Sequence, residues 1–426
     1  MAHTDYILQS ISSGKTFKDT GWLLDAPGEE KPGLIRAIYN KKQLEVKDGE
    51  GFYKFADWLP VKDYLKGSSA PMTYKSTGLA NVLGLSNLYI TFSGYFPEKG
   101  IKMRTCSFKE TEAYSVCARL EPEHDKILVV ASAGNTARAF ARVCSDNNIP
   151  LLLCVPEDNI DVLWFDEPIN DNVKLIISRS GADYFDAIHL SNLAAQLDGF
   201  VTEGGAKNVA RRDGMGTTVL SAATFIGQIP EYYFQAVGSG TGAIAAWEAN
   251  LRLIEDGRFG SHKMKLMISQ NEPFVPMYNA WKANSRNLLP FDDDEARKEV
   301  EQIDAKVLSN RRPPWALAGG LFDALTDAGG DVLTISNQKA REANKLFEEL
   351  EGIDIHPAAA VATASLIDYA KNGQLDKDAI VMLNITGGGE ERFKSEHELH
   401  YLKPTLVFDL NPTLDEVREK LGGIFH

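Results

Sequence analysis

Along most of this chain, two patterns of hydrophobic and polar positions take turns, one typical of buried strands and the other of helices. Short, almost wholly apolar runs of three to five residues are separated by stretches with helical spacing, such as Ala340, Ala343, Leu346, Phe347 and Leu350. The runs predict strands near 88–92, 127–130, 151–155, 173–177, 200–201, 234–237, 266–268, 332–335 and 380–383. Helices are predicted over 135–144 and 187–197, and others begin near Thr241, Lys339 and Pro357. This alternation predicts an α/β protein with two largely parallel sheets and helices on both faces.

The first 45 residues carry a different pattern. Residues 6–9 and 34–39 are expected to pair as strands of a separate small β element, with a glycine- and lysine-rich loop between them. The aromatic stretch 53–59 is expected to dock on the main body, and 60–73 has the character of a linker.

Composition narrows the class of protein. The chain has 426 residues, 44% hydrophobic and 24% charged, which is typical of a globular protein with more than one core. No run of eighteen apolar residues occurs, so we expect a cytoplasmic protein. A net charge of −14 argues against nucleic acid or an anionic membrane as partner. The four cysteines lack paired or metal-type spacing, so neither disulfides nor a metal site are expected.

The turn Thr105-Cys106-Ser107-Phe108-Lys109 comes directly before a predicted helix. We interpret Lys109 as the residue that binds pyridoxal phosphate (PLP) through its amino group, although an isolated lysine is most often a solvated surface residue. The hypothesis depends on two loops of small residues, 132–136 and 238–242, that each join a buried strand to a helix. Ligands of parallel α/β sheets bind beyond the carboxyl ends of the strands, where these loops fall.

The loop Gly238-Ser239-Gly240-Thr241-Gly242 is the predicted phosphate site. Glycines let backbone amides turn toward an anion, and the following helix adds its positive end. The spacing is not the G-x-G-x-x-G of dinucleotide sites, and no lysine follows the last glycine as in nucleotide triphosphate loops. A tight turn without a ligand remains the alternative.

Two further stretches have small or basic residues that suit anions. Ser132, Ala133, Gly134 and Thr136 are candidates for binding a carboxylate at a helix start, and Asn135 for bonding a phenolic oxygen; an ordinary helix cap is the alternative. The stretch 204–216 brings the cations Lys207, Arg211 and Arg212 directly after a predicted strand. They predict a second anion site, and a solvated helix face is the alternative.

Four of these motifs, in this order, resemble the threonine synthase branch of the fold-type II PLP-dependent enzymes. The 105–109 turn resembles the lysine motif, 132–136 the asparagine loop and 238–242 the cofactor phosphate loop. The run 383–389 resembles the late strand whose hydroxyl, here Thr386, faces the pyridine nitrogen. Within that branch, the stretches 93–100, 204–216, 233–238 and 271–281 are most similar to the cysteate synthases.

The resemblance implies a reaction and an architecture. Cysteate synthases convert the small anions O-phosphoserine and sulfite to L-cysteate and phosphate by β-replacement, in coenzyme M or sulfonolipid synthesis. The resemblance also implies a homo-oligomer with PLP in the cleft between two domains. We expect a large PLP domain over 46–105 and 225–426 and a smaller, mobile α/β domain over 106–224. Archaeal relatives begin with a cysteine-rich knuckle, whereas Ser10 and Ser13 stand here, so no zinc is expected.

Three other functions remain open from the sequence. A threonine synthase acting on O-phosphohomoserine, or an O-phosphoserine sulfhydrylase, would share the lysine and both loops. A non-enzymatic two-domain binding protein would share the alternating fold but would not need a lysine at a helix start.

Overall fold

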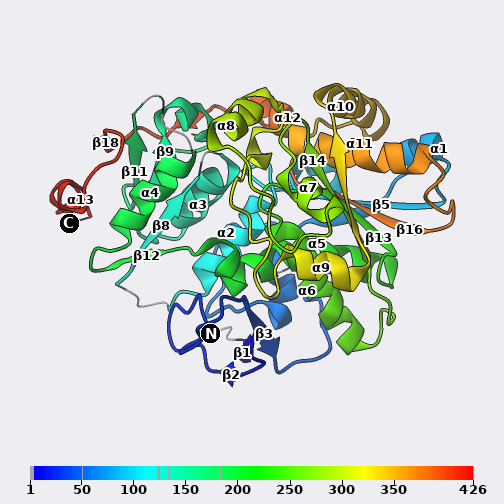
Figure 1. Cartoon of the computed structure of the whole chain (residues 1–426), viewed down its shortest axis with the longest axis horizontal. Coiled ribbons are helices and arrows are strands. Elements are labelled where there is room, and N and C mark those ends of the chain that lie inside the picture. The colour runs from blue at the N-terminus through cyan, green and yellow to red at the C-terminus, as the bar shows by residue number, and fades with distance from the viewer. Residues whose placement is uncertain are drawn as a thin grey trace.

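The computed structural model describes residues 4–49, 51–121, 125–132, 134–179, 181 and 184–425. Two sheets form the body of the molecule, on the left and the right of Figure 1. The six-stranded sheet has the order β15 (Asp331–Ile335), β14 (Lys265–Asn271), β13 (Tyr232–Ala236), β16 (Ile380–Ile385), β5 (Asn87–Phe92) and β4 (Met72–Lys75). The five-stranded sheet has the order β12 (Phe200–Thr202), β8 (Ile127–Ala131), β9 (Leu151–Pro156), β11 (Val173–Ser178) and β18 (Leu406–Phe408).

All strand pairs in these two sheets are parallel except β4 with β5. The predicted α/β class with largely parallel sheets is therefore confirmed. The strand β4 lies within and beyond the stretch predicted as a linker. Its four residues, MTYK, carry too weak an apolar pattern to be recognised without a neighbouring strand.

Helices cover both faces of each sheet. One face of the six-stranded sheet carries α1 (Gly78–Leu83), α10 (Asn337–Glu351) and α11 (Pro357–Lys371), and the other α5 (Val209–Ile226), α6 (Thr241–Asp256) and α9 (Leu321–Ala328). The five-stranded sheet lies between α3 (Asn135–Asp146) on one face and α4 (Tyr184–Ala194) with α13 (Leu414–Leu421) on the other. The remaining helices are α2 (Lys109–Ala118), α7 (Pro276–Lys282), α8 (Asp293–Gln302) and α12 (Glu390–Glu396).

The apolar strands are buried on both sides because successive residues point to opposite faces. In β13, Tyr233 belongs to the core under α6, whereas Phe234 belongs to the core under α11. In β9, Leu153 likewise faces α3, whereas Leu152 faces α4. This burial on two faces explains why the strands read as continuous apolar runs.

The N-terminal element packs below both sheets in Figure 1. Strand β1 (Tyr6–Ser10) pairs antiparallel with β2 (Thr16–Phe17) and with β3 (Ile35–Tyr39), as predicted for the first 45 residues. The aromatic stretch forms the buried short helix η1 (Gly51–Trp58). The remaining short strands are β6 (Tyr95–Phe96), β7 (Ile101–Lys102), β10 (Trp164–Phe165) and β17 (His400–Tyr401); the remaining 3-10 helices are η2 (Pro97–Lys99), η3 (Glu157–Val162), η4 (Gly205–Lys207) and η5 (Lys306–Leu308).

The expected domain boundaries need two corrections. The chain returns to the smaller sheet after residue 400, because β17 pairs with β10 and β18 extends the five-stranded sheet beside β11. Helix α5, expected in the smaller domain, packs against α6 and the strands β4 and β5 of the larger sheet as well as against α2. Both differences have the same reason: the order of segments in the sequence does not show which of the two sheets a distant segment will pack against. The mobility of the smaller domain stays a prediction.

Within the described residues, no helix combines the length and the apolar character needed to cross a membrane.

Candidate active site

Lys109 is the first residue of α2, as predicted, and the turn before it is tied to the loop that follows β16. The amide of Phe108 donates to the Thr386 carbonyl (2.9 Å), and the amide of Gly388 donates to the Cys106 carbonyl (3.1 Å). Cys106 has a φ of 54°, an unusual conformation for a residue other than glycine. These bonds bring the lysine motif to the carboxyl end of the large sheet.

The amino group of Lys109 lies in a charged chain that the sequence did not reveal. Its Nζ is 3.0 Å from Oε2 of the buried Glu112, and Nη2 of Arg211 is 2.9 Å from the other Glu112 oxygen. Burial lowers the pKa of Lys109, Arg211 adds to this effect, and Glu112 opposes it. A lysine with a lowered pKa is more available as a nucleophile and base, the roles that PLP binding and proton transfer require.

The glycine loop between β13 and α6 leaves no room for larger side chains. A Cβ on Gly238 would lie 2.6 Å from the Val307 carbonyl oxygen, and one on Gly242 would lie 2.5 Å from the Gln235 side chain. Gly240 has a φ of 79°, which favours glycine. The loop leads into the N-terminus of the 16-residue helix α6. A tight backbone at a helix start suits a phosphate group.

The asparagine loop lies between β8 and α3. The Ser132 hydroxyl accepts from the Gly134 amide (3.1 Å). Gly134 is the N-cap of α3 and the helix start has no side-chain cap, so the carboxylate role of Ser132 stays a prediction. Thr136 is buried in the first turn, and Asn135 lines a cavity of about 550 Å³. Ala133 lies outside the described residues.

Val307 of η5 connects the asparagine and glycine loops. A Cβ on Gly134 would lie 3.7 Å from its Cγ1, and its carbonyl oxygen is the atom nearest a Cβ on Gly238. The two loops are therefore neighbours, although about 100 residues separate them in the sequence.

These residues fit PLP. Besides the cradle of glycines, the buried Ser107 hydroxyl has no hydrogen-bond partner among the described residues, and it sits two positions before Lys109. The buried Thr386 offers a neutral hydroxyl. The set contains the groups that the sequence predicts for this cofactor: the Lys109 amine for covalent attachment, the 238–242 loop for the phosphate, the Asn135 amide for the phenolic oxygen and Thr386 for the ring nitrogen.

The three predicted cations have different surroundings. The ammonium of Lys207 is exposed and pairs with Asp25 (2.7 Å). Arg212 is fully buried, pairs with Glu248 (3.0 Å) and donates to the Ala206 and Ile35 carbonyls. Arg211 pairs with Glu203 and, through Glu112, reaches Lys109. Helix α5 is thus not a solvated face, and Arg211 is the cation in contact with the lysine's partner.

Sequence reasoning missed Glu112, Val307 and a buried arginine, Arg138, that contacts Asn135. Glu112 and Arg138 each lie three residues after their partners, Lys109 and Asn135, so helical i,i+3 spacing could have found both. No local signal identifies Val307, because its position depends on packing. The 550 Å³ cavity beside Arg138 is lined from the smaller-sheet side by Asp161, Val162 and Trp164, and from the larger-sheet side by η5, His356 and the start of α12.

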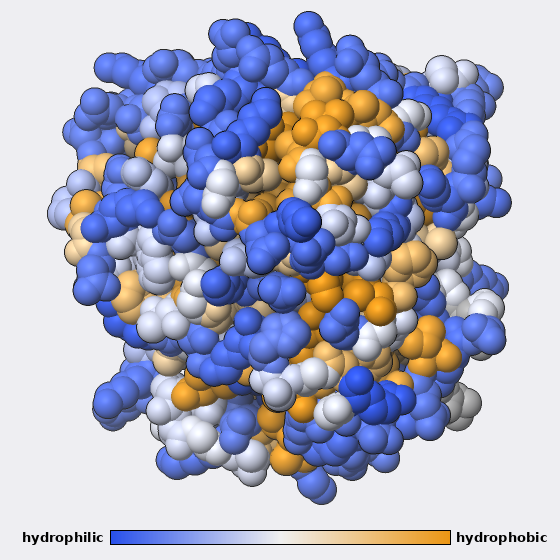
Figure 2. Space-filling view, turned by 90° about the vertical axis from the view of Figure 1, so that its right-hand side faces the viewer, coloured by the Kyte–Doolittle hydropathy of each residue, from blue (hydrophilic) through white to orange (hydrophobic). Residues whose placement is uncertain are grey.

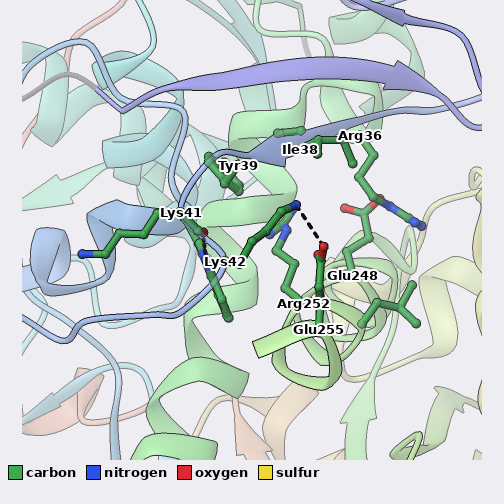
Figure 3. A pocket seen from close by; sticks show the side chains of 11 residues that line it. Arg36, Ile38, Tyr39, Lys41, Lys42, Glu248, Arg252 and Glu255 are labelled. Atoms are coloured by element: carbon green, nitrogen blue, oxygen red, sulfur yellow. Dashed lines mark hydrogen bonds and ion pairs between the residues drawn. The ribbon is translucent and has the colours of Figure 1, made fainter. Parts of the chain in front are cut away.

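A second, smaller cavity of about 100 Å³ lies between β3 and α6 (Figure 3). Two ion pairs lie between residues that line it, Lys42 with Glu255 (2.9 Å) and Arg36 with Glu248 (3.2 Å). None of the residues predicted to hold the cofactor lines it.

Ser10 and Ser13, which stand where the archaeal relatives have a cysteine-rich knuckle, belong to a cluster of hydrogen-bonded side chains. The hydroxyls of Ser10 and Ser12 donate to the Glu29 carboxylate, and the amide of Ser13 donates to Ser10 Oγ (3.3 Å). Across the described part of the chain, no group of three or more His, Cys, Asp or Glu side chains is arranged to hold a metal ion.

Comparison with known proteins identifies the family of this chain. The family model of pyridoxal-phosphate dependent enzymes matches residues 100–387. The cysteate synthase of Methanosarcina acetivorans is 48% identical over 94% of this chain and 96% of its own length. That of Methanospirillum hungatei is 43% identical over 98% of both.

Solved structures support the fold. Maize serine racemase has a TM-score of 0.58 at 14% identity, covering 75% of this chain and 88% of its own. A hydrogen sulfide-producing enzyme from Fusobacterium nucleatum has a TM-score of 0.54 at 15% identity, covering 77% of this chain and 97% of its own. The similarity to curated cysteate synthases extends over nearly the full length of the chain, which also has a lysine at a helix start and a tight glycine loop. We conclude that this chain belongs to the cysteate synthase family of pyridoxal-phosphate dependent enzymes.

Proposed function

We propose that this chain replaces the phosphate of O-phospho-L-serine with sulfite, giving L-cysteate and inorganic phosphate. The observation that carries the proposal is Lys109, a buried amine at a helix start beside a glycine cradle, in a chain of the cysteate synthase family. β-Replacement requires an amine to attach the cofactor and then to move a proton at Cα, and the lowered pKa and the buried surroundings of Lys109 suit both roles.

When bound, PLP withdraws electrons from the Cα of the amino acid attached to it. The chain's residues do the rest. The 238–242 loop and the α6 N-terminus bind the cofactor phosphate, and Asn135 donates to its phenolic oxygen. Thr386, a neutral hydroxyl, keeps the ring nitrogen unprotonated. The Lys109 amine takes the proton from Cα and later returns one, and Glu112 stabilises its ammonium form between the two transfers.

Both substrates are anions, so the site needs a cation. We infer that Arg211 supplies it, because it is largely buried and shares Glu112 with Lys109. Charge on the leaving phosphate grows as the Cβ–O bond breaks, so a nearby guanidinium lowers the barrier of that step. Ser132, Gly134 and Thr136 are the proposed site for the substrate carboxylate, at the start of α3.

The experiment that tests the proposal is product analysis. Purified protein with PLP is given O-phosphoserine with sulfite, with sulfide or with neither, and also O-phosphohomoserine. We expect cysteate to form only with sulfite. The kcat/KM of this reaction should be higher than that of any reaction in the other mixtures. Cysteine formed faster with sulfide, or threonine from phosphohomoserine, would instead indicate a sulfhydrylase or a threonine synthase.

Lys109→Ala is the matched variant. It should lose both cysteate formation and the visible absorbance of lysine-bound PLP. A borohydride-stable adduct at the wild-type level in this variant would remove Lys109 from the role.

We also infer a homo-oligomer. Large apolar side chains such as Val82 and Phe225 are exposed, and apolar atoms gather on the face at the right-hand end of the molecule (Figure 2). Light scattering at several concentrations tests it. The cytoplasmic location stays a prediction.

A further inference from the structure

Arg138 is a buried cation at the meeting point of the cofactor motifs. It lies one turn into α3 and is 2% exposed. Its Nη2 donates to Asn135 Oδ1 (2.9 Å) and to the Thr105 carbonyl (3.1 Å), and its Nη1 donates to the Val162 carbonyl (3.0 Å). One side chain therefore contacts both the asparagine loop and the lysine turn.

The contact with Asn135 determines which way its amide points. A guanidinium can only donate hydrogen bonds, so the amide atom facing Arg138 must be the oxygen. The NH₂ group of Asn135 is then directed away from Arg138, and Asn135 lines the cavity. An NH₂ group, not an oxygen, is what a phenolic oxygen of the cofactor would need from this residue.

The contact with Thr105 acts on the lysine turn. The carbonyl of Thr105 accepts from both Nε (3.3 Å) and Nη2 (3.1 Å) of Arg138, immediately before Cys106 with its positive φ. This pair of bonds holds the turn from which Lys109 enters α2. Without these two hydrogen bonds, Thr105 would no longer be held in place next to Cys106.

The charge of Arg138 is balanced from the other side of the cavity. Glu390, at the start of α12, lies 3.3 Å from Nη2 and also contacts His356 (2.9 Å) and Lys394 (2.7 Å). Burial alone would raise the pKa of Glu390, yet His356 and Arg138 hold it well below its usual range. The Trp164 ring packs over the guanidinium at 4.0 Å. A buried arginine with a full set of partners is fixed in one geometry.

We propose that Arg138 is a positioning residue: it orients the amide of Asn135 and holds the lysine turn in register with the loop after β16. The proposal rests on the proposed PLP chemistry but not on the identity of the substrate. The hydrogen bonds of Arg138 go to Asn135 and to the Thr105 carbonyl, so its proposed effect passes through the asparagine loop and the lysine turn.

The test compares Arg138→Met, Arg138→Lys, Asn135→Ala and the double variant Arg138→Met/Asn135→Ala. We measure the visible absorbance of bound PLP as a function of pH, the PLP Kd, and kcat and KM separately. Arg138→Met should shift the absorbance titration and lower kcat by roughly tenfold to a hundredfold, with a smaller change in KM. Arg138→Lys should recover part of the loss. The double variant should be little worse than Asn135→Ala alone.

Arg142→Met is the control, since Arg142 is buried one turn further along α3 and donates to Ser145, Asp146 and the Glu167 carbonyl, none of them in the cofactor motifs. It should lower stability without moving the PLP titration. A wild-type titration and kcat in folded Arg138→Met, or losses that simply add to those of Asn135→Ala, would overturn the proposal. The spectroscopic result stands even if sulfite proves not to be the nucleophile, so the two proposals fail separately.

Discussion

Two glutamates half a turn apart on α2 differ in their partners. Glu112 meets two cations, Lys109 and Arg211. Glu110 instead accepts two neutral hydrogen bonds, from the Thr105 amide (3.0 Å) and hydroxyl (2.9 Å). Burial therefore raises the pKa of Glu110 to about 7, although these bonds oppose the rise. Glu110 is thus expected to be partly protonated near neutral pH.

Stability should therefore fall as pH rises through Glu110's range. An acid whose pKa is higher in the folded than in the unfolded protein binds more protons when folded, so its contribution is largest below about 4.5 and is lost as pH rises through about 7. The difference amounts to at most about 3 kcal/mol. Glu110→Gln should remove this component, as seen by urea unfolding at pH 5.5 and 8. Equal pH dependence in both proteins would contradict it.

Arg211 is the second residue whose substitution gives a test. Arg211→Ala should lower kcat/KM for O-phosphoserine by about tenfold to a hundredfold, because one charge-assisted contact is lost as phosphate leaves. Lys207→Ala, which removes an exposed partner of Asp25, should cost far less. Steady-state kinetics at varied phosphoserine and sulfite measures both. If Lys207→Ala has the larger effect, the assignment within the basic stretch is wrong.

At the scale of elements, α2 and α5 make an unusually close contact. Gly214 of α5 allows it, because a Cβ there would lie 2.5 Å from the Thr111 carbonyl oxygen and 2.8 Å from the Ser115 Cβ. The contact places Arg211, one turn earlier on α5, beside Glu112 of α2. The distance between α2 and α5 therefore determines whether Arg211 can reach Glu112, the partner of Lys109.

Gly214→Ala should push these helices apart. We expect a loss of about 1–3 kcal/mol from overpacking, partly offset by alanine's better helix propensity, and a lower kcat. Gly216→Ala is the matched variant, since its Cβ would meet α6 at 3.2 Å rather than α2. It should cost less stability and leave the absorbance of bound PLP unchanged. Unfolding free energies and PLP spectra of both variants test the link.

The glycine loop needs a probe that avoids its glycines, since any Cβ there would clash. Ser239 is suitable, because among the described residues its hydroxyl hydrogen-bonds with Thr241 of the same loop (2.8 Å Oγ to Oγ1, 3.3 Å to the amide) and with no other residue. Ser239→Asp places a carboxylate at the α6 N-terminus, where it should compete with the cofactor phosphate and weaken PLP binding at least tenfold. Ser239→Asn, similar in size but neutral, should bind PLP far better. Equal affinities in fluorescence titration would mean that phosphate binds elsewhere.

At the scale of the whole molecule, the C-terminal segment closes the smaller sheet. β18 adds to β11, and Phe408, Val417 and Leu421 complete the core over α4 (Figure 1). The chain thus crosses from the larger sheet back to the smaller one after α12. The smaller sheet cannot be complete without the end of the chain.

Phe408→Ala should therefore lower the unfolding free energy by about 3–5 kcal/mol, because Phe408 is fully buried. Leu410→Ala, two residues on and 47% exposed, is the control and should change stability little. Urea unfolding followed by fluorescence compares them. A Phe408→Ala protein as stable as wild type would show that β18 is dispensable.

The sequence by itself determined most strands of the two sheets, several of the helices and the four motifs. These depend on local signals: runs of apolar residues in parallel strands buried on both faces, helical spacing, and small residues at the joins between them. Lys109, Asn135, the 238–242 loop and Thr386 stand at those joins, so their order alone predicted a shared edge.

Only the tertiary structure decided which charges meet. Arg211 and Arg212 are adjacent and chemically equal, yet a 100° step around α5 directs one to Glu112 and the other to Glu248. Arg138 binds Asn135 three residues away but Glu390 252 residues away, and β18 joins a sheet formed more than 200 residues earlier. Such contacts depend on how elements pack, and no local pattern encodes them.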